Sequence, residues 1–124
     1  MVSFVIIIPT YNGISAGLEK LLISIKNQSV QPEKIYIIDS SSTDNTVEVC
    51  KSYGCIVDVI DKSDFNHGLT RQKGIENNSV YDVSVFMTQD ILLKDNNTLK
   101  ILLSSFENKE VSATYGRQIT YDNA

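Results

Sequence analysis

The sequence predicts an α/β protein whose mostly parallel sheet carries helices on both faces. Apolar, β-branched runs at residues 2–8, 34–38, 56–60 and 83–88 alternate with stretches of helical periodicity. The first run, VSFVIII, is almost continuously apolar, which is typical of a strand buried on both faces of a parallel sheet. Strands that alternate with helices form βαβ units with right-handed crossovers. The 124 residues contain no repeat or linker, so we expect a single domain.

The first strand, residues 2–8, is expected to end where the segment from Pro9 to Gly13 follows it. A helix is expected from about residue 14 to Asn27. Its apolar residues recur at helical spacing, and they are Ile14, Leu18, Leu21, Leu22 and Ile25. Pro32 then separates this helix from the second strand. The pattern therefore predicts a strand, a helix and a strand within the first 38 residues.

The second helix is expected to start after Ser42 or Thr43, either of which can cap its N-terminus. Gly54 marks its end, because glycine readily adopts the left-handed conformation that terminates helices. The apolar face of this helix consists of Val47, Val49, Cys50 and Tyr53. After the third strand we expect a loop over 61–68, a helix over about 69–77, a helix from Asp95 or Asn96 to Phe106, and a strand over 111–116.

The composition is that of a soluble globular protein, with 42% hydrophobic and 21% charged residues. The net charge of -4 and the scattered basic residues argue against a nucleic acid partner, which would require a basic stripe. Two isolated cysteines and one histidine cannot form a zinc site. Unpaired thiols fit a reducing compartment, so we expect a cytoplasmic protein. No apolar run is long enough to span a bilayer, and peripheral contact with the inner face of the cytoplasmic membrane is compatible with this composition.

Polar residues follow each of the four predicted strands. These segments are Thr10–Asn12, Asp39–Asp44, Asp64–Arg71 and Thr88–Asp90. Ligands of open α/β sheets bind beyond the carboxyl ends of the strands, so we expect these segments to border one cleft. An acid after a strand is by itself more often a turn former, and Ser42 to Asp44 suit a helix cap and an acidic first turn. Neither a GxxxxGK[ST] loop nor a GxGxxG motif is present, which disfavours Walker-type NTPases and dinucleotide-binding domains.

Several of these segments, taken in order, resemble family 2 glycosyltransferases of the GT-A fold. The segments are PTYN after the first strand, IIDSSSTDNT after the second, and a fourth strand that ends in an acid. DFNHGLTRQKGIE, VFMTQD and YGRQ are similar more narrowly to the bacterial rhamnosyltransferase-like branch. The resemblance extends from Val2 to about Gln118, and it implies the Rossmann-like, nucleotide-binding half of a GT-A fold.

The resemblance implies a pocket for the nucleotide. The residues implied for the base are Pro9, Thr10, Tyr11 and Asn12. Asp39 would accept hydrogen bonds from the base, for which a carboxylate is a suitable acceptor. Arg71 would lie beside the base and the diphosphate, since its fork suits phosphate oxygens, although a salt bridge is its structural alternative. Asn66 and His67 would shape the donor pocket, and Asp44 would support the second loop.

Thr88, Gln89 and Asp90 fall on the DxD motif of this family. The resemblance implies that Asp90 binds a divalent cation, Mg²⁺ or Mn²⁺, that bridges the donor diphosphate and neutralises the leaving group. Thr88 replaces the first acid and can still bond a ribose hydroxyl, while Gln89 is implied near the donor. Strand alternation predicts Thr88 and Asp90 on one face and Gln89 on the other.

The resemblance also implies an activity. We expect an inverting, metal-assisted transfer of a sugar, such as rhamnose from dTDP-rhamnose, to a lipid-linked or polysaccharide acceptor of the cell surface. UDP-sugars are the alternative donors. Members of the family continue beyond the point that matches Ala124, and the acceptor half and catalytic base are expected there. Residues 1–124 would then be the donor-binding half, and Tyr115–Gln118 would border the acceptor side.

A non-catalytic regulatory module of the receiver or flavodoxin type is the main alternative. Acids at strand ends and a parallel sheet fit a receiver. A receiver also needs an acid pair after the first strand, where this chain has PTYN. A family scaffold that has lost its activity is a third possibility, which the replacement of the first DxD acid by Thr88 keeps open.

Overall fold

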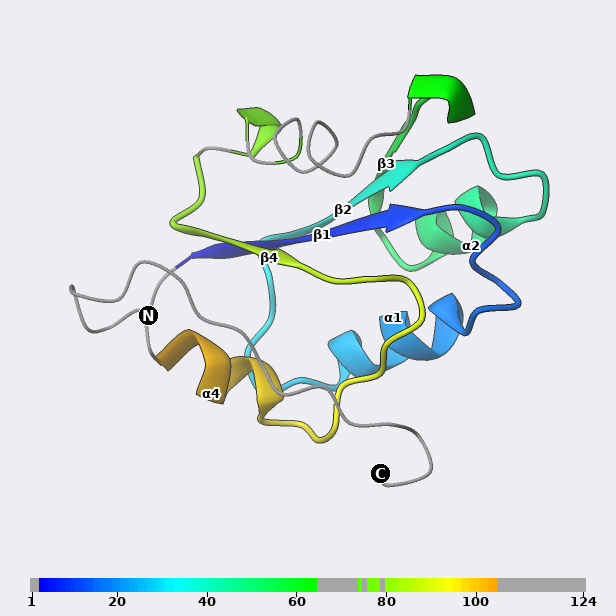
Figure 1. The fold of residues 1–124 in the computed structure, drawn as a ribbon. Helices are drawn as coiled ribbons and strands as arrows, with labels where there is room; N and C mark the ends of the chain where they lie inside the picture. The colour runs from blue at the N-terminus through cyan, green and yellow to red at the C-terminus, as the bar shows by residue number, and fades with distance from the viewer. Residues whose placement is uncertain (1–2, 65–73, 75, 79, 105–124) are drawn as a thin grey trace.

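The computed structural model describes residues 3–64, 74, 76–78 and 80–104, which contain a four-stranded parallel sheet (Figure 1). The strands are β1 (Phe4–Thr10), β2 (Lys34–Asp39), β3 (Ile56–Val59) and β4 (Val83–Phe86). Their order across the sheet is β3-β2-β1-β4, and every neighbouring pair is parallel. The prediction of a parallel α/β fold is therefore confirmed.

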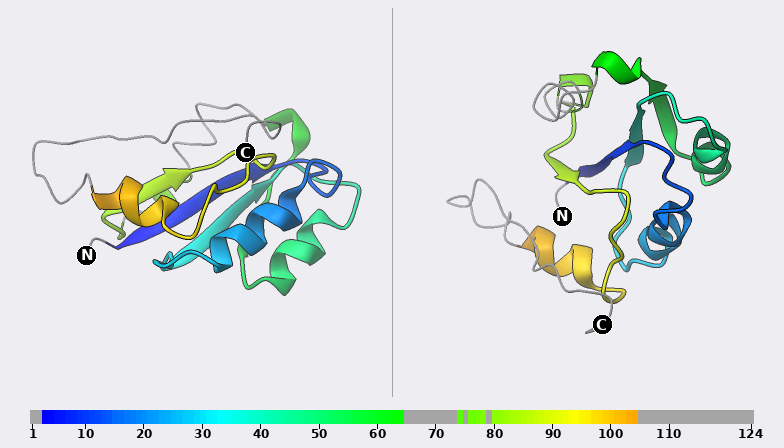
Figure 2. Two further views of the ribbon diagram at one scale, coloured as in Figure 1. Left: turned by 90° about the horizontal axis from the view of Figure 1, so that it is seen from below. Right: turned by 45° about the vertical axis from the view of Figure 1, so that its right-hand side comes forward.

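Helices cover the sheet on one face, and a helical segment covers the other (Figures 1 and 2). The helices are α1 (Leu18–Lys26), α2 (Thr46–Ser52), the 3₁₀ turn η1 (Lys62–Asp64) and α4 (Thr98–Ser104). The apolar side chains of α1, α2 and α4 share one core with alternate residues of the strands. On the opposite face the helical residue Gly74 lies so close that an added Cβ would be 3.0 Å from the Ile7 Cγ2.

The central strand β1 is buried on both faces, as its apolar sequence predicts. Phe4, Ile6 and Ile8 face the core beneath α1, while Val5 and Ile7 face the smaller cluster with Tyr36 and Ile38. Residues 5–8 are all 0% exposed. Cys50 and Cys55 are buried free thiols that pack in the core as small apolar side chains.

The prediction that Pro9 ends the first strand is wrong, because β1 continues to Thr10. Carbonyl and N–H groups point alternately to the two neighbouring strands: Ile7 O accepts from Met87 N on the β4 side, and Thr10 O accepts from Ser40 N on the β2 side. The missing N–H of Pro9 therefore points toward β4, whose pairing with β1 has already ended at Ile7. Proline is tolerated there since no ladder bond is lost.

The first helix begins at Leu18, four residues later than predicted. Gly17 precedes it with φ of 95°, a left-handed conformation that interrupts a continuous helix. Residues 13–17 form turns instead, in which Ala16 N and Leu18 N both donate to Gly13 O. The predicted end at Asn27 is confirmed.

The second helix begins at Thr46, and the predicted caps Ser42 and Thr43 do not cap it. Asn45 occupies the N-cap position without a side-chain cap bond, since Ser42 bonds Asp39 and Thr43 bonds Asn12. The predicted glycine stop is confirmed, because Gly54 follows the helix with φ of 81°.

The boundaries of the later strands and helices agree only in part with those predicted from the sequence. The strands β3 and β4 end one and two residues earlier than predicted. Asp95 starts the turn into α4, because its Oδ1 accepts from Asn97 N at 2.9 Å. The predicted strand 111–116 and most of the predicted helix 69–77 lie outside the described residues. Within the part of the chain that the structure describes, no helix has the length and apolar character needed to cross a membrane.

Candidate functional site

The parallel strands bring three predicted site segments to one edge of the sheet. The loops after β1, β2 and β4 leave at this edge, where Figure 1 shows the blue arrow of β1 and the cyan arrow of β2 pointing the same way. The register places Thr10 beside Asp39, and the turn after β4 returns to the loop after β1. Hydrogen bonds therefore link the three loops at this edge, as we expect where the carboxyl ends of parallel strands lie together.

Asp39 is the centre of this edge and is 0% exposed. Its Oδ1 accepts hydrogen bonds from the hydroxyls of Thr10 and Ser42, both at 2.6 Å. Its Oδ2 accepts from Ser42 N at 2.8 Å. A buried carboxylate requires such donors, because burial without them would cost several kcal/mol. The neighbouring Ser40 Oγ is also buried, and no described group bonds it.

Asn12 joins the loop after β1 to the loop after β2. Its backbone has φ of 46°, a left-handed conformation that asparagine tolerates better than most residues. Its Oδ1 accepts from Thr43 N at 2.8 Å, and its own N–H donates to Ser42 Oγ at 2.9 Å. Gly13 N adds a third bond between the loops, to Thr46 Oγ1 at 3.0 Å. The PTYN and SSSTDNT segments thus form a single unit.

Gln89 holds the backbone of Tyr11 from the other side. Its Oε1 accepts from Tyr11 N at 2.9 Å, and its Nε2 donates to Tyr11 O at 3.1 Å. Gly13 makes room for this amide, because a Cβ there would lie 2.7 Å from the Gln89 Oε1. The side chain that the family resemblance implied near the donor is therefore engaged with the protein backbone, where it positions Tyr11.

Thr88 and Asp90 are exposed, whereas Gln89 is half-buried. The prediction that the strand continues through residue 88, on which the expected alternation of these side chains rested, is wrong. Strand β4 ends at Phe86, Met87 N makes the last bond to β1, and residues 88–91 turn with Ile91 N donating to Thr88 O at 3.4 Å.

Asp90 fits one ligand of a hard cation such as Mg²⁺. An exposed carboxylate at the sheet edge supplies a charged oxygen, and Mg²⁺ is commonly held by one or two carboxylates together with substrate phosphates. Among the described residues, no group of three or more His, Cys, Asp or Glu side chains could hold a metal ion alone. The fit is therefore to a cation shared with a phosphate ligand.

Asp44 supports the second loop, as the resemblance implied. Burial works to raise its pKa, but hydrogen bonds from the Thr46 hydroxyl and N–H outweigh it and lower the pKa below its ordinary value. The two donors lie on the first residue of α2, so the carboxylate ties the loop to the start of that helix.

Lys62 is a residue at this edge that the sequence analysis did not select. Its Nζ donates to the Tyr11 hydroxyl at 3.0 Å and lies 4.2 Å from the centre of the Tyr11 ring. No motif marks a lysine in an exposed turn. Gln89 was implied near the donor and Ser42 was a candidate helix cap, so their hydrogen bonds to Tyr11 and Asp39 are also contacts that the sequence analysis did not predict.

Three predicted site residues and one predicted acceptor segment fall in other parts of the chain. Asn66, His67 and Arg71, together with Tyr115–Gln118 on the predicted acceptor side, lie outside the described residues. The structure therefore assembles Pro9, Thr10, Tyr11, Asn12, Asp39, Thr88, Gln89 and Asp90 at one edge of the sheet, where Pro9 is half-buried within β1.

Known proteins resemble the chain along its whole length. It is 40% identical to the O-antigen chain rhamnosyltransferase WbaN of Salmonella anatum over 124 residues, which is all of this chain and 39% of that protein. It is 38% identical over 120 residues to the O-antigen chain rhamnosyltransferase RfbN of Salmonella typhimurium, covering 96% of this chain and 38% of that protein. The chain thus spans about two fifths of the length of these relatives.

The fold also matches a solved enzyme structure. Glucosyl-3-phosphoglycerate synthase from Mycobacterium tuberculosis, in complex with Mn²⁺, UDP and glucosyl-3-phosphoglycerate, superposes with a TM-score of 0.68 at 18% identity. The match covers 85% of this chain and 39% of that one. The family model for glycosyl transferase family 2 matches residues 5–124. The parallel sheet, the joined loops at its carboxyl edge and these matches identify the chain as a member of glycosyl transferase family 2.

Proposed function

We propose that the full-length protein is an inverting rhamnosyltransferase and that residues 1–124 are its donor-binding half. The donor is dTDP-rhamnose, and the acceptor is a growing polysaccharide or its lipid-linked precursor. The observation that carries the proposal is the joined edge around Tyr11 and Asp39 in a chain about 40% identical to O-antigen chain rhamnosyltransferases. Catalysis of this kind is mainly positioning of the donor and stabilisation of the leaving diphosphate.

The nucleotide base would bind over the loop after β1. Tyr11 offers an aromatic face, and its backbone is held on both its N–H and its carbonyl by Gln89. Asp39 Oδ2 accepts one bond from Ser42 N, and a carboxylate oxygen can accept a second from a base N–H. Because Asp39 is fully buried, a base would reach this oxygen only after the surrounding loops move apart.

The diphosphate would bind near Asp90 and Thr88. A divalent cation held by Asp90 and the phosphate oxygens would stabilise the negative charge that develops on the departing diphosphate. Thr88 supplies an exposed hydroxyl for the ribose, and Arg71 supplies a cation for the phosphates in this proposal. The base that activates the acceptor hydroxyl is expected outside residues 1–124.

A titration of the full-length protein tests this function. Binding of dTDP-rhamnose, UDP-sugars and dTDP would be measured by calorimetry with Mg²⁺, with Mn²⁺ and with EDTA. We expect dTDP-rhamnose to bind more tightly than UDP-sugars, and tightly only with a cation present. Failure of every nucleotide-sugar to bind under all three conditions refutes the proposal.

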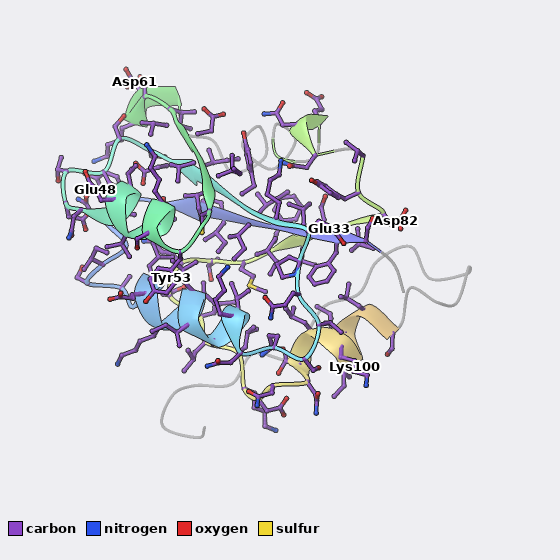
Figure 3. All side chains as sticks on the ribbon, turned by 180° about the vertical axis from the view of Figure 1, so that it is seen from behind. Glu33, Glu48, Tyr53, Asp61, Asp82 and Lys100 are labelled. Atoms are coloured by element: carbon purple, nitrogen blue, oxygen red, sulfur yellow. The ribbon has the colours of Figure 1, made fainter. Side chains whose placement is uncertain are left out.

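Two variants locate the cation. Asp90→Asn should remove the difference between Mg²⁺ and EDTA while the protein stays folded. Glu48→Gln is the matched control, because Glu48 is an exposed acid on α2 (Figure 3) and its loss should leave the metal dependence unchanged. Retained metal dependence in Asp90→Asn would remove Asp90 from the role.

A further inference from the structure

The contact between Lys62 and Tyr11 is unusual for two side chains in surface loops. The Lys62 ammonium lies 4.2 Å from the centre of the Tyr11 ring, well within the range of about 6 Å for a cation–π interaction. The same ammonium donates to the Tyr11 hydroxyl at 3.0 Å. One ammonium therefore contacts both the ring and the hydroxyl of Tyr11, and these two contacts together favour one position of that side chain.

The backbones on both sides of this contact are held in place. Tyr11 is bonded at its N–H and carbonyl by the Gln89 amide. Lys62 opens η1, which Asp61 stabilises by accepting from Ser63 N at 3.0 Å and from Ser63 Oγ at 2.9 Å. These bonds lower the pKa of Asp61 below its ordinary value. Lys62 therefore contacts the ring from a turn that hydrogen bonds between Asp61 and Ser63 stabilise.

We propose that Lys62 is a positioning residue for donor binding, which holds the Tyr11 ring in the orientation that a pyrimidine base stacks on. The inference rests on the proposed function. In this proposal the base stacks on the side of the ring opposite the ammonium, which lies 4.2 Å from the ring centre. A tyrosine without this partner would have to be ordered at the moment of binding, which lowers affinity by about two- to tenfold for a single side chain.

Four single variants of the full-length protein and one double variant test the inference, with dTDP as the probe. Lys62→Met keeps the aliphatic stem and removes the charge, whereas Lys62→Arg keeps the charge and the contact with the ring. Lys100→Met is the control, because Lys100 is an exposed lysine on α4, far in Figure 3 from Asp61, the neighbour of Lys62. Tyr11→Ala, alone and combined with Lys62→Met, completes a double-mutant cycle.

We expect the dTDP dissociation constant to rise about two- to tenfold in Lys62→Met, to recover in Lys62→Arg, and to stay at the wild-type value in Lys100→Met. The melting temperature should be the same in all three. Adding Lys62→Met to Tyr11→Ala should weaken binding no further, because the ring through which Lys62 acts is gone.

Two results would overturn the inference and leave the proposed function standing. In the first, Lys62→Met binds dTDP as the wild type does. In the second, Lys62→Met weakens binding equally in the Tyr11→Ala background, which would mean that the ammonium contacts the diphosphate directly. Failure of the wild-type protein to bind dTDP or any nucleotide-sugar would refute the proposed function together with this inference.

Discussion

The replacement Gln89→Leu should loosen the loop after β1 and weaken donor binding at the same time. Leucine keeps the approximate volume of glutamine but removes both hydrogen bonds to Tyr11, at 2.9 Å and 3.1 Å. Each such bond contributes about 0.5–1.5 kcal/mol, so the free energy of unfolding should fall by about 1–3 kcal/mol. Urea denaturation with an unchanged m-value measures the loss, and calorimetry with dTDP measures the affinity.

Gly13 provides an internal check on this reasoning. Gly13→Ala would place a Cβ 2.7 Å from the Gln89 Oε1, so the amide must leave Tyr11. Gly13→Ala should therefore destabilise the Gln89→Ala variant less than it destabilises the wild type. The part of its cost that comes from the close approach of the new Cβ to Leu18 should remain in both backgrounds.

The matched control for Gln89→Leu is Gln31→Leu. Gln31 is an exposed glutamine whose amide donates to backbone carbonyls near the end of α1, away from the site. Its replacement should leave dTDP affinity unchanged. A loss below about 0.3 kcal/mol in Gln89→Leu, with wild-type dTDP affinity, would refute the positioning role of Gln89.

Three further predictions concern stability. Gln28→Leu should lower the free energy of unfolding, measured by urea denaturation, by about 2–4 kcal/mol. The reason is that the buried Gln28 amide donates to Asp95 O and accepts from Leu99 N. A loss under about 1 kcal/mol would contradict this prediction. Gly54→Ala should cost about 1 kcal/mol, since φ is 81° there and alanine is strained in that region; an unchanged urea midpoint would contradict it. The lowered pKa of Asp44 means that its stabilisation is present above its ordinary value of 3.8 and is lost as pH falls through the folded value. Asp44→Asn should therefore flatten the acid side of a melting-temperature profile, and an unchanged slope would show that the bonds to Thr46 do not matter.

The pattern of apolar residues and glycines along the chain was sufficient to predict the strands and helices, because the residues within each element favour that element. The continuous apolar run of β1 requires burial on both faces, and the glycine at position 54 ends α2 by its left-handed backbone. Boundaries were predicted less well where a neighbour decided them. Proline in β1 is tolerated only because β4 has already stopped pairing, which no property of the PTYN segment reveals.

What the sequence alone determined was the order of strands and helices, the parallel sheet, and the edge at which its polar segments gather. The tertiary structure decided which of those side chains join the loops by hydrogen bonds, as Asp39, Asn12 and Gln89 do, and which stay exposed at the edge, as Thr88 and Asp90 do. Gln89, which bonds the backbone of Tyr11, lies 78 residues from it along the chain, and Lys62 bonds the Tyr11 hydroxyl from a turn 51 residues away. Such pairings depend on how loops from separate strands meet in space. Hydrophobic periodicity reports which face of an element is buried, and it carries no information about those meetings.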